Sequence, residues 1–187
     1  MHRRAFLLAS LAAAAAPAAR AARARQGLFI HETPVPLPAL SVKDGDGRPV
    51  ELQYPLVLNL WASWCLPCVA ELPALDRLKP WADARGVAVV ALSLDRAGAA
   101  AVRPAYGRIG VTNLAVHTDD TRLAAETLKA PVLPVTVLVD RQGREAARYV
   151  GPAAWDQARD LVTALAEGRP ITAAMAPPPA KHTGAAP

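Results

Sequence analysis

The sequence predicts an α/β fold in which helices flank a mixed central sheet. Apolar runs of strand length alternate with helix-length segments between residues 40 and 170, the order found when helices cover the faces of a sheet. The runs at 56–61 and 87–94 are almost continuously apolar, as expected of central strands buried on both faces. Two late runs, at 135–139 and 144–150, are separated only by a short polar turn. They are predicted to form an antiparallel hairpin, which makes the sheet mixed.

The predicted elements follow one another in the order β-β-β-α-β-α-β-α-β-β-α. The first two strands, 40–43 and 49–52, flank Asp44-Gly45-Asp46-Gly47, a sequence typical of a tight turn. These two strands are predicted to form an N-terminal β-hairpin extension of the sheet. The other strands are predicted at 56–61, 87–94, 114–117, 135–139 and 144–150, and the helices at 65–84, 96–109, 121–129 and 153–167.

Residues 40–170 are predicted to form one globular domain, with three segments outside it. Residues 1–24 combine a basic start, an alanine-rich apolar stretch and small-residue sites, the three parts of a secretory signal peptide. Arg3-Arg4 leaves a twin-arginine export signal open, and an uncleaved segment that anchors the domain to the membrane is the main alternative. The alternating prolines of residues 25–39 predict an extended linker rather than an element of structure, and the Ala/Pro-rich residues 171–187 predict a disordered tail.

The charge of the chain is concentrated in its first residues. Five of the 21 basic residues lie in residues 1–25, which hold no acidic residue, so the rest of the chain carries 16 basic and 16 acidic residues. The high isoelectric point therefore belongs to the N-terminal segment, and no basic cluster follows it. The sequence thus excludes nucleic acid as an expected partner.

The chain contains two cysteines, Cys65 and Cys68, placed between the strand 56–61 and the following helix. A thiol at a helix N-terminus has a lowered pKa, because unpaired backbone N–H groups and the helix dipole favour the thiolate. Cys65 is therefore predicted to attack a target disulfide, and Cys68, one turn further on, to resolve the mixed disulfide. A metal site would need ligands that the nearby sequence lacks, and a structural disulfide would close too small a loop to stabilise the fold much.

The residues around this pair carry a family resemblance. The segment Trp61-Ala-Ser-Trp-Cys-Leu-Pro-Cys-Val-Ala-Glu-Leu-Pro73 resembles the TlpA/ResA-like branch of the thioredoxin superfamily, which comprises bacterial thiol–disulfide oxidoreductases that face the extracytoplasmic space. The resemblance covers roughly residues 35–168. It implies a thioredoxin fold, with Cys65 as the nucleophile and Cys68 as the resolving cysteine.

The same resemblance assigns a role to Glu71, which matches an acidic residue that the branch carries near the dithiol. A carboxyl one turn below the cysteines could exchange protons with them, especially if partial burial raises its pKa. Asn59 stands where ordinary thioredoxins have a buried aspartate, and its side chain does not titrate. Glu71 is therefore the predicted catalytic acid and base, with a solvated helix glutamate as the alternative.

A second motif, Pro134-Val-Thr-Val-Leu-Val-Asp140, resembles the cis-proline strand of the family. In that fold the cis-proline loop lies against the cysteines, and the preceding residue, here Leu133, pairs through its backbone with the substrate chain. The family usually has glycine where this chain has Val132, which predicts a reshaped or narrower docking groove. The predicted substrate-binding residues are Trp64, Leu66, Pro67, Leu133 and Pro134.

The resemblance implies a periplasmic dithiol reductant of the cytochrome c maturation or copper-centre assembly type. Its partners would be oxidised client proteins and a membrane thiol-electron donor, and it would need no cofactor beyond the redox-active Cys65–Cys68 disulfide. Anchoring to the inner membrane is the alternative location. Two other functions stay open, namely an oxidant of the same fold that inserts disulfides, and a metallochaperone that binds Cu(I) through the two thiolates.

Overall fold

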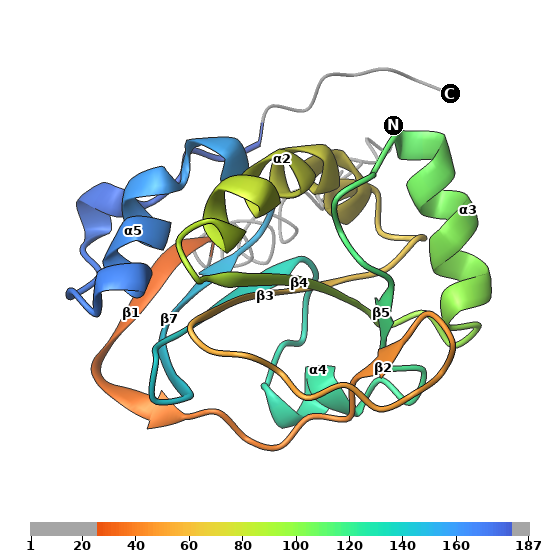
Figure 1. The fold of residues 1–187 in the computed structure, drawn as a ribbon, viewed down its shortest axis with the longest axis horizontal. Helices are drawn as coiled ribbons and strands as arrows, with labels where there is room; N and C mark the ends of the chain where they lie inside the picture. Colours follow the sequence, from red (N-terminus) through yellow and green to blue (C-terminus); the bar gives the residue numbers. More distant parts are fainter. Residues whose placement is uncertain (1–25, 181–187) are drawn as a thin grey trace, which may run out of the picture.

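The computed structural model describes residues 26–180, so the predicted signal peptide and the last seven residues of the predicted tail lie outside the described residues. A seven-stranded mixed sheet with the strand order β1-β7-β6-β3-β4-β5-β2 forms its centre (Figure 1). The strands are β1 (Gly27–Pro36), β2 (Lys43–Asp44), β3 (Leu56–Trp61), β4 (Ala88–Ser93), β5 (His117–Thr118), β6 (Val135–Val139) and β7 (Arg144–Val150). The helices are α2 (Leu66–Asp83), α3 (Ala99–Ile109), α4 (Leu123–Thr127), η1 (Trp155–Gln157), α5 (Arg159–Glu167) and η2 (Ala173–Met175).

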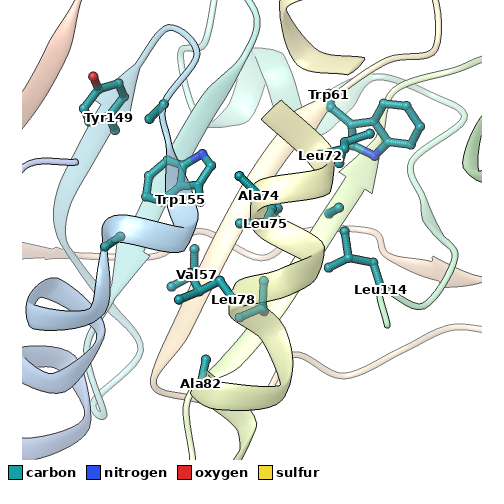
Figure 2. Packing of buried hydrophobic residues seen from close by; sticks show 14 of the residues in the cluster. Val57, Trp61, Leu72, Ala74, Leu75, Leu78, Ala82, Leu114, Tyr149 and Trp155 are labelled. Carbon is teal, nitrogen blue, oxygen red and sulfur yellow. The ribbon is translucent and has the colours of Figure 1, made fainter. Parts of the chain in front are cut away.

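β3 lies in the middle of the sheet, and all of its side chains are buried. It pairs in parallel with β4 and antiparallel with β6, which confirms the predicted mixed sheet. Because successive side chains of a strand point to opposite faces, β3 contributes side chains to two hydrophobic cores, one on each face of the sheet. Val57 and Trp61 face the core beneath α2, α3 and α5, and Figure 2 shows part of this core, with Trp155 and Trp61 on opposite sides of α2. The leucines of β3 face the core on the side of α4.

The predicted hairpin over residues 40–52 forms only in part. Its turn is present, since Asp44 N–H donates to the carbonyl of Arg48 at 2.8 Å and Gly47 N–H to that of Asp44 at 3.1 Å. The second arm contributes a single bridge, from Pro49 to Lys43, and β2 takes β5 as its partner. The pairing of β2 with β5, rather than the hairpin, therefore closes this edge of the sheet.

The prediction of a linker over residues 25–39 is wrong for most of that segment. Residues 27–36 form β1, which pairs antiparallel with β7 from Gly27 opposite Val150 to Pro36 opposite Arg144. Proline lacks an N–H donor, but β1 is an edge strand whose single neighbour is β7. Pro34 and Pro36 therefore interrupt no hydrogen bonds to a second neighbouring strand. Alternating prolines are thus compatible with a strand at this position.

The prediction of a disordered tail is wrong for the described part of that segment. Ile171 is buried in the core beneath α5, and η2 follows it. Ala154 N–H donates to the carbonyl of Pro178 at 2.9 Å, and Ala180 N–H to that of Pro152 at 3.1 Å. This segment is ordered by backbone hydrogen bonds to the loop at residues 152–154. Amino-acid composition gives no information about such bonds, so it could not predict this order.

The closing helix predicted at 153–167 is divided into the short turn η1 and helix α5, with the side chain of Trp155 fully buried at the start. Residues 152–154 therefore form a loop that leads into η1, and η1 contacts α2. None of the helices within residues 26–180 is long and apolar enough to cross a membrane.

Candidate active site

Cys65 and Cys68 form a disulfide at the N-terminus of α2, with their Cα atoms 5.3 Å apart. Cys65 is the N-cap residue in extended conformation, and Pro67 occupies the first turn, where a missing N–H leaves no helical hydrogen bond unmade. The exposed fraction is 7% for Cys65 and zero for Cys68. A partner molecule can therefore reach Cys65, while Cys68 lies behind it.

The N-terminus of α2 is electrostatically suited to a thiolate at Cys65. Among the described residues, no side chain caps this end, and the first turn of α2 contains no acidic residue. The positive end of the helix dipole is therefore not neutralised locally, and it is available to a negative charge on sulfur. Such a position lowers the pKa of a cysteine thiol.

Asp95 fixes the loop that leads from β3 to Cys65. Its carboxylate accepts hydrogen bonds from the Ser63 N–H and hydroxyl and from the Ser93 hydroxyl, all at 2.8 Å, and it is almost fully buried. The sequence analysis missed Asp95, although it lies only two residues after the end of the buried strand β4. The strand order places the ends of β4 and β3 side by side, and this puts Asp95 beside Ser63.

We expect Asp95→Asn to destabilise the protein by about 2 kcal/mol, because an amide cannot accept all of the hydrogen bonds that a buried carboxylate accepts. Chemical denaturation of the oxidised protein measures this difference. Asp46→Asn is the matched control, since Asp46 forms only exposed ion pairs, which contribute little. Equal stability of the two variants would contradict the role of Asp95 in holding the loop.

Glu71 is buried one helical turn beyond Cys68, on the same face of α2. Its Oε1 accepts a hydrogen bond from Asn59 Nδ2 at 2.7 Å, and its Oε2 accepts from Ala153 N–H at 2.9 Å and from Trp155 Nε1 at 3.0 Å. Burial raises the pKa of Glu71 to about 7, although these three hydrogen bonds lower it. Glu71 therefore differs from the solvated helix glutamate that was the alternative.

Asn59 reaches Glu71 from the central strand and also donates to Thr136 Oγ1 at 2.9 Å. Its Oδ1 is buried and has no hydrogen-bond partner among the described residues. The sequence analysis noted Asn59 only as a substitution in the family pattern and did not predict its hydrogen bond to Glu71. It missed Thr136, Ala153 and Trp155, because β6 and the loop after β7 reach this position only in the folded chain.

The loop before β6 contains a cis peptide bond between Leu133 and Pro134, as the motif predicts. The carbonyl of Pro134 accepts a hydrogen bond from Gly151 N–H at 2.9 Å. Within residues 26–180, no hydrogen bond engages the backbone N–H or carbonyl of Leu133. Both groups are therefore available to another chain.

A groove of about 860 Å³ runs beside this loop, and its walls are mainly apolar. Of the predicted substrate-binding residues, Pro67 and Leu133 line the groove. Trp64 and Leu66 are 59% and 80% exposed beside the dithiol but do not line it, and the Arg122 guanidinium lies 5.1 Å from the ring centre of Trp64. The groove is also lined by Gln26, Phe29, Lys129, Ala130, Pro131, Val132, Val135, Arg148, Val150, Gly151, Pro152, Pro179 and Ala180.

The side chains near the dithiol, among the described residues, offer little to hold a metal ion. Within the part of the chain that the structure describes, no three His, Cys, Asp or Glu side chains are grouped as metal ligands. His117, which lies in β5, has a pKa lowered mainly by burial, and its Nδ1 has no partner among the described residues. A Cu(I) ion at the dithiol would thus be held by the two thiolates of the reduced protein.

The sheet order, the dithiol at the start of the helix that follows the central strand, and the cis-proline loop define a thioredoxin-fold thiol–disulfide oxidoreductase. Comparison with known proteins agrees, and the chain belongs to the Redoxin family, whose model matches residues 32–165. It is 29% identical over 118 residues to the thiol–disulfide oxidoreductase ResA of Bacillus thuringiensis, covering 61% of this chain and 67% of that protein. The predicted TlpA/ResA-like resemblance is therefore confirmed.

Solved structures of other proteins share the fold. A secreted thiol-disulfide isomerase from Corynebacterium glutamicum superposes with a TM-score of 0.63 at 19% identity, over 75% of this chain and 92% of that one. A thio-disulfide isomerase from Thermus thermophilus gives a TM-score of 0.55 at 28% identity, over 71% of this chain and 97% of that one. Each match spans nearly the whole length of the other protein, so the fold agrees well beyond the residues of the dithiol motif.

Proposed function

We propose that this oxidoreductase is an extracytoplasmic dithiol reductant of protein disulfides, in which Cys65 attacks and Cys68 resolves. The observation that carries the assignment of roles is the difference in exposure between the two sulfur-bearing residues. Cys65 is reachable at the positive end of α2, whereas Cys68 is completely buried. Only a nucleophile that can be reached from outside can contact a client disulfide, and the attacking species is the thiolate.

The reaction is an exchange of two electrons between dithiols. The Cys65 thiolate attacks one sulfur of the client disulfide, forming a mixed disulfide and releasing a client thiolate that takes up a proton. Cys68 then loses its proton and attacks the sulfur of Cys65, so the Cys65–Cys68 disulfide forms and the second client thiol leaves. The client is reduced and the protein is oxidised, and a thiol-electron donor must return two electrons.

Glu71 is the proposed acceptor of the proton that Cys68 loses. A carboxyl with a pKa near 7 is present in both protonation states around neutral pH, which suits proton transfer in either direction. Its place one turn beyond Cys68 on the same helix face supports this role. The surrounding side chains of Asn59 and Trp155 hold the carboxylate by hydrogen bonds and keep it away from solvent.

Client binding is proposed to occur along the cis-proline loop. The unpaired backbone groups of Leu133 would pair with an extended client segment, as in the addition of a strand to an open edge. Apolar client side chains would enter the groove that Pro67 and Leu133 line, and Trp64 and Leu66 would contact the client from the other side of the dithiol. Val132, which is 54% exposed, would limit the approach at the groove mouth.

The proposed location is the periplasm, with a membrane thiol protein as the electron donor and oxidised proteins of cytochrome c maturation or copper-centre assembly as clients. The signal-peptide pattern of residues 1–24 supports export. The likeness to ResA supports thiol–disulfide exchange as the reaction.

The reduction potential of the Cys65–Cys68 couple tests the direction of electron flow. The protein is equilibrated in graded thiol buffers, and free thiols are trapped by alkylation. We expect a value near or below roughly −230 mV, in the range of thioredoxin-like reductants. A value near roughly −120 mV would make the protein an oxidant. The absence of any reversible couple would overturn the redox function and favour Cu(I) binding.

A further inference from the structure

Residues 176–180, here called the strap, lie against the loop that supplies two hydrogen bonds to Glu71. Ala180 N–H donates to the carbonyl of Pro152 at 3.1 Å, and the carbonyl of Pro178 accepts from Ala154 N–H at 2.9 Å. Pro179 pairs with Ala153 as an antiparallel bridge. The strap therefore binds the residues immediately before and after Ala153.

The peptide group between Pro152 and Ala153 joins the strap to the buried carboxyl. Its carbonyl accepts from Ala180 N–H, and its N–H donates to Glu71 Oε2 at 2.9 Å. In a trans peptide the carbonyl and the N–H point in opposite directions, so the strap and Glu71 lie on opposite sides of this group. A hydrogen bond received by the carbonyl also polarises the peptide and strengthens the bond that its N–H donates.

We propose that the strap is a positioning element of the redox site, which holds the Pro152–Ala153 peptide and the neighbouring Trp155 against Glu71. The proposal rests on the role of Glu71 given above, and it assigns a function to a segment whose composition indicates disorder. The strap also reaches the client side of the site, since Pro179 and Ala180 line the groove. The same short segment thus lines the docking groove and holds in place the residues that donate hydrogen bonds to the buried carboxyl of Glu71.

The titration of Glu71 can be followed with little interference from the side chains that surround it. Asn59 and Thr136, from β3 and β6, do not titrate, and neither do Ala153 and Trp155. Among residues 26–180, Tyr149 of β7 is a titratable neighbour of Glu71, and burial raises its pKa further above the neutral range. In the oxidised protein the two cysteines carry no proton to exchange.

The test uses Ala180→Pro in the full chain, which removes the N–H that the Pro152 carbonyl accepts. The control is Ala185→Pro, the same substitution at a position outside the described residues. Amide exchange at Ala153 and the carbon-13 titration of the Glu71 carboxyl are measured by NMR in the oxidised protein. In Ala180→Pro we expect Ala153 to exchange about tenfold faster or more. We also expect the midpoint of Glu71 to rise by roughly half a pH unit, because the Ala153 hydrogen bond, which lowers the pKa of Glu71, is weakened.

A second variant, Pro178→Gly with Pro179→Gly, keeps every strap N–H but makes the strap more flexible, and it should shift both quantities in the same direction. Unchanged exchange at Ala153 and an unchanged midpoint in both strap variants would overturn the proposal. This failure is distinct from failure of the Glu71 role itself, which Glu71→Gln tests in the reduced protein through the pH dependence of mixed-disulfide resolution.

Discussion

Replacing Cys68 with serine is expected to arrest the reaction at a covalent complex between Cys65 and the client. Cys65 can still attack, because it keeps its place at the N-terminus of α2, but no second thiol is present to release the client. We expect steady-state reduction of a disulfide-containing test protein to fall about a thousandfold or more. Non-reducing electrophoresis and intact-mass analysis should show an adduct with the mass of the two chains together.

Cys65→Ser is the matched control for this experiment. It should lose activity to a similar degree and form no adduct, because the remaining thiol of Cys68 is buried and cannot reach a client. Accumulation of the adduct in Cys65→Ser, with none in Cys68→Ser, would reverse the assigned roles. Adducts with both variants in equal amount would mean that the difference in exposure does not decide which sulfur attacks.

The parts of the fold that could be predicted from the sequence are those fixed by neighbouring residues. β6 and β7 follow from two apolar runs around a short turn, and their bounds in the structure agree with the prediction. The step from β3 to α2 follows from a buried apolar run and a proline in the first helical turn. For the same reason the dithiol could be placed at a helix N-terminus before the structure was known.

The errors concern segments whose structure depends on distant partners. Alternating prolines around Pro34 suggest a polyproline conformation, but the backbone angles of that conformation lie close to those of a strand. The partner strand β7, more than 100 residues away, decides which of the two forms. The tail shows the same limit, since Pro178 and Ala180 are ordered by backbone bonds to residues 152–154 that composition cannot indicate.

The candidate site contains both kinds of feature, those that neighbouring residues fix and those that depend on distant parts of the chain. Cys65, Cys68 and Glu71 share one helix, so their spacing alone predicts that they lie close together. The groups that set the protonation of Glu71 come from β3, from η1 and from the loop after β7. Sequence reasoning could therefore place the carboxyl near the dithiol, but its burial and hydrogen bonds required the structure.

The buried carboxyl of Glu71 should make the stability of the oxidised protein depend on pH. Its pKa rises from 4.5 to about 7 on folding, mainly because burial disfavours the charged form. The unfolded chain loses this proton at a lower pH than the folded one. The contribution of Glu71 is therefore fully present below about pH 4.5 and is lost as the pH rises through about 7, and it amounts to roughly 3 kcal/mol.

Glu71→Gln should remove this dependence, because glutamine is neutral throughout the range. Its carbonyl oxygen can accept from Ala153 and Trp155, and its amide can donate to Asn59 Oδ1, which has no partner among residues 26–180, once the Asn59 amide turns over. Relative to the unchanged protein, the variant should gain roughly 3 kcal/mol of unfolding free energy between pH 4.5 and pH 8.

Denaturant unfolding of both oxidised proteins at several pH values measures this difference. The difference isolates Glu71, because His117, whose pKa is lowered by burial, contributes equally to both chains. The exposed Glu51 supplies the control Glu51→Gln, which should keep the pH dependence of the unchanged protein. A difference between Glu71→Gln and the unchanged protein that stays constant with pH would mean that Glu71 is already ionised in acid, and it could not then accept the proton of Cys68 near neutral pH.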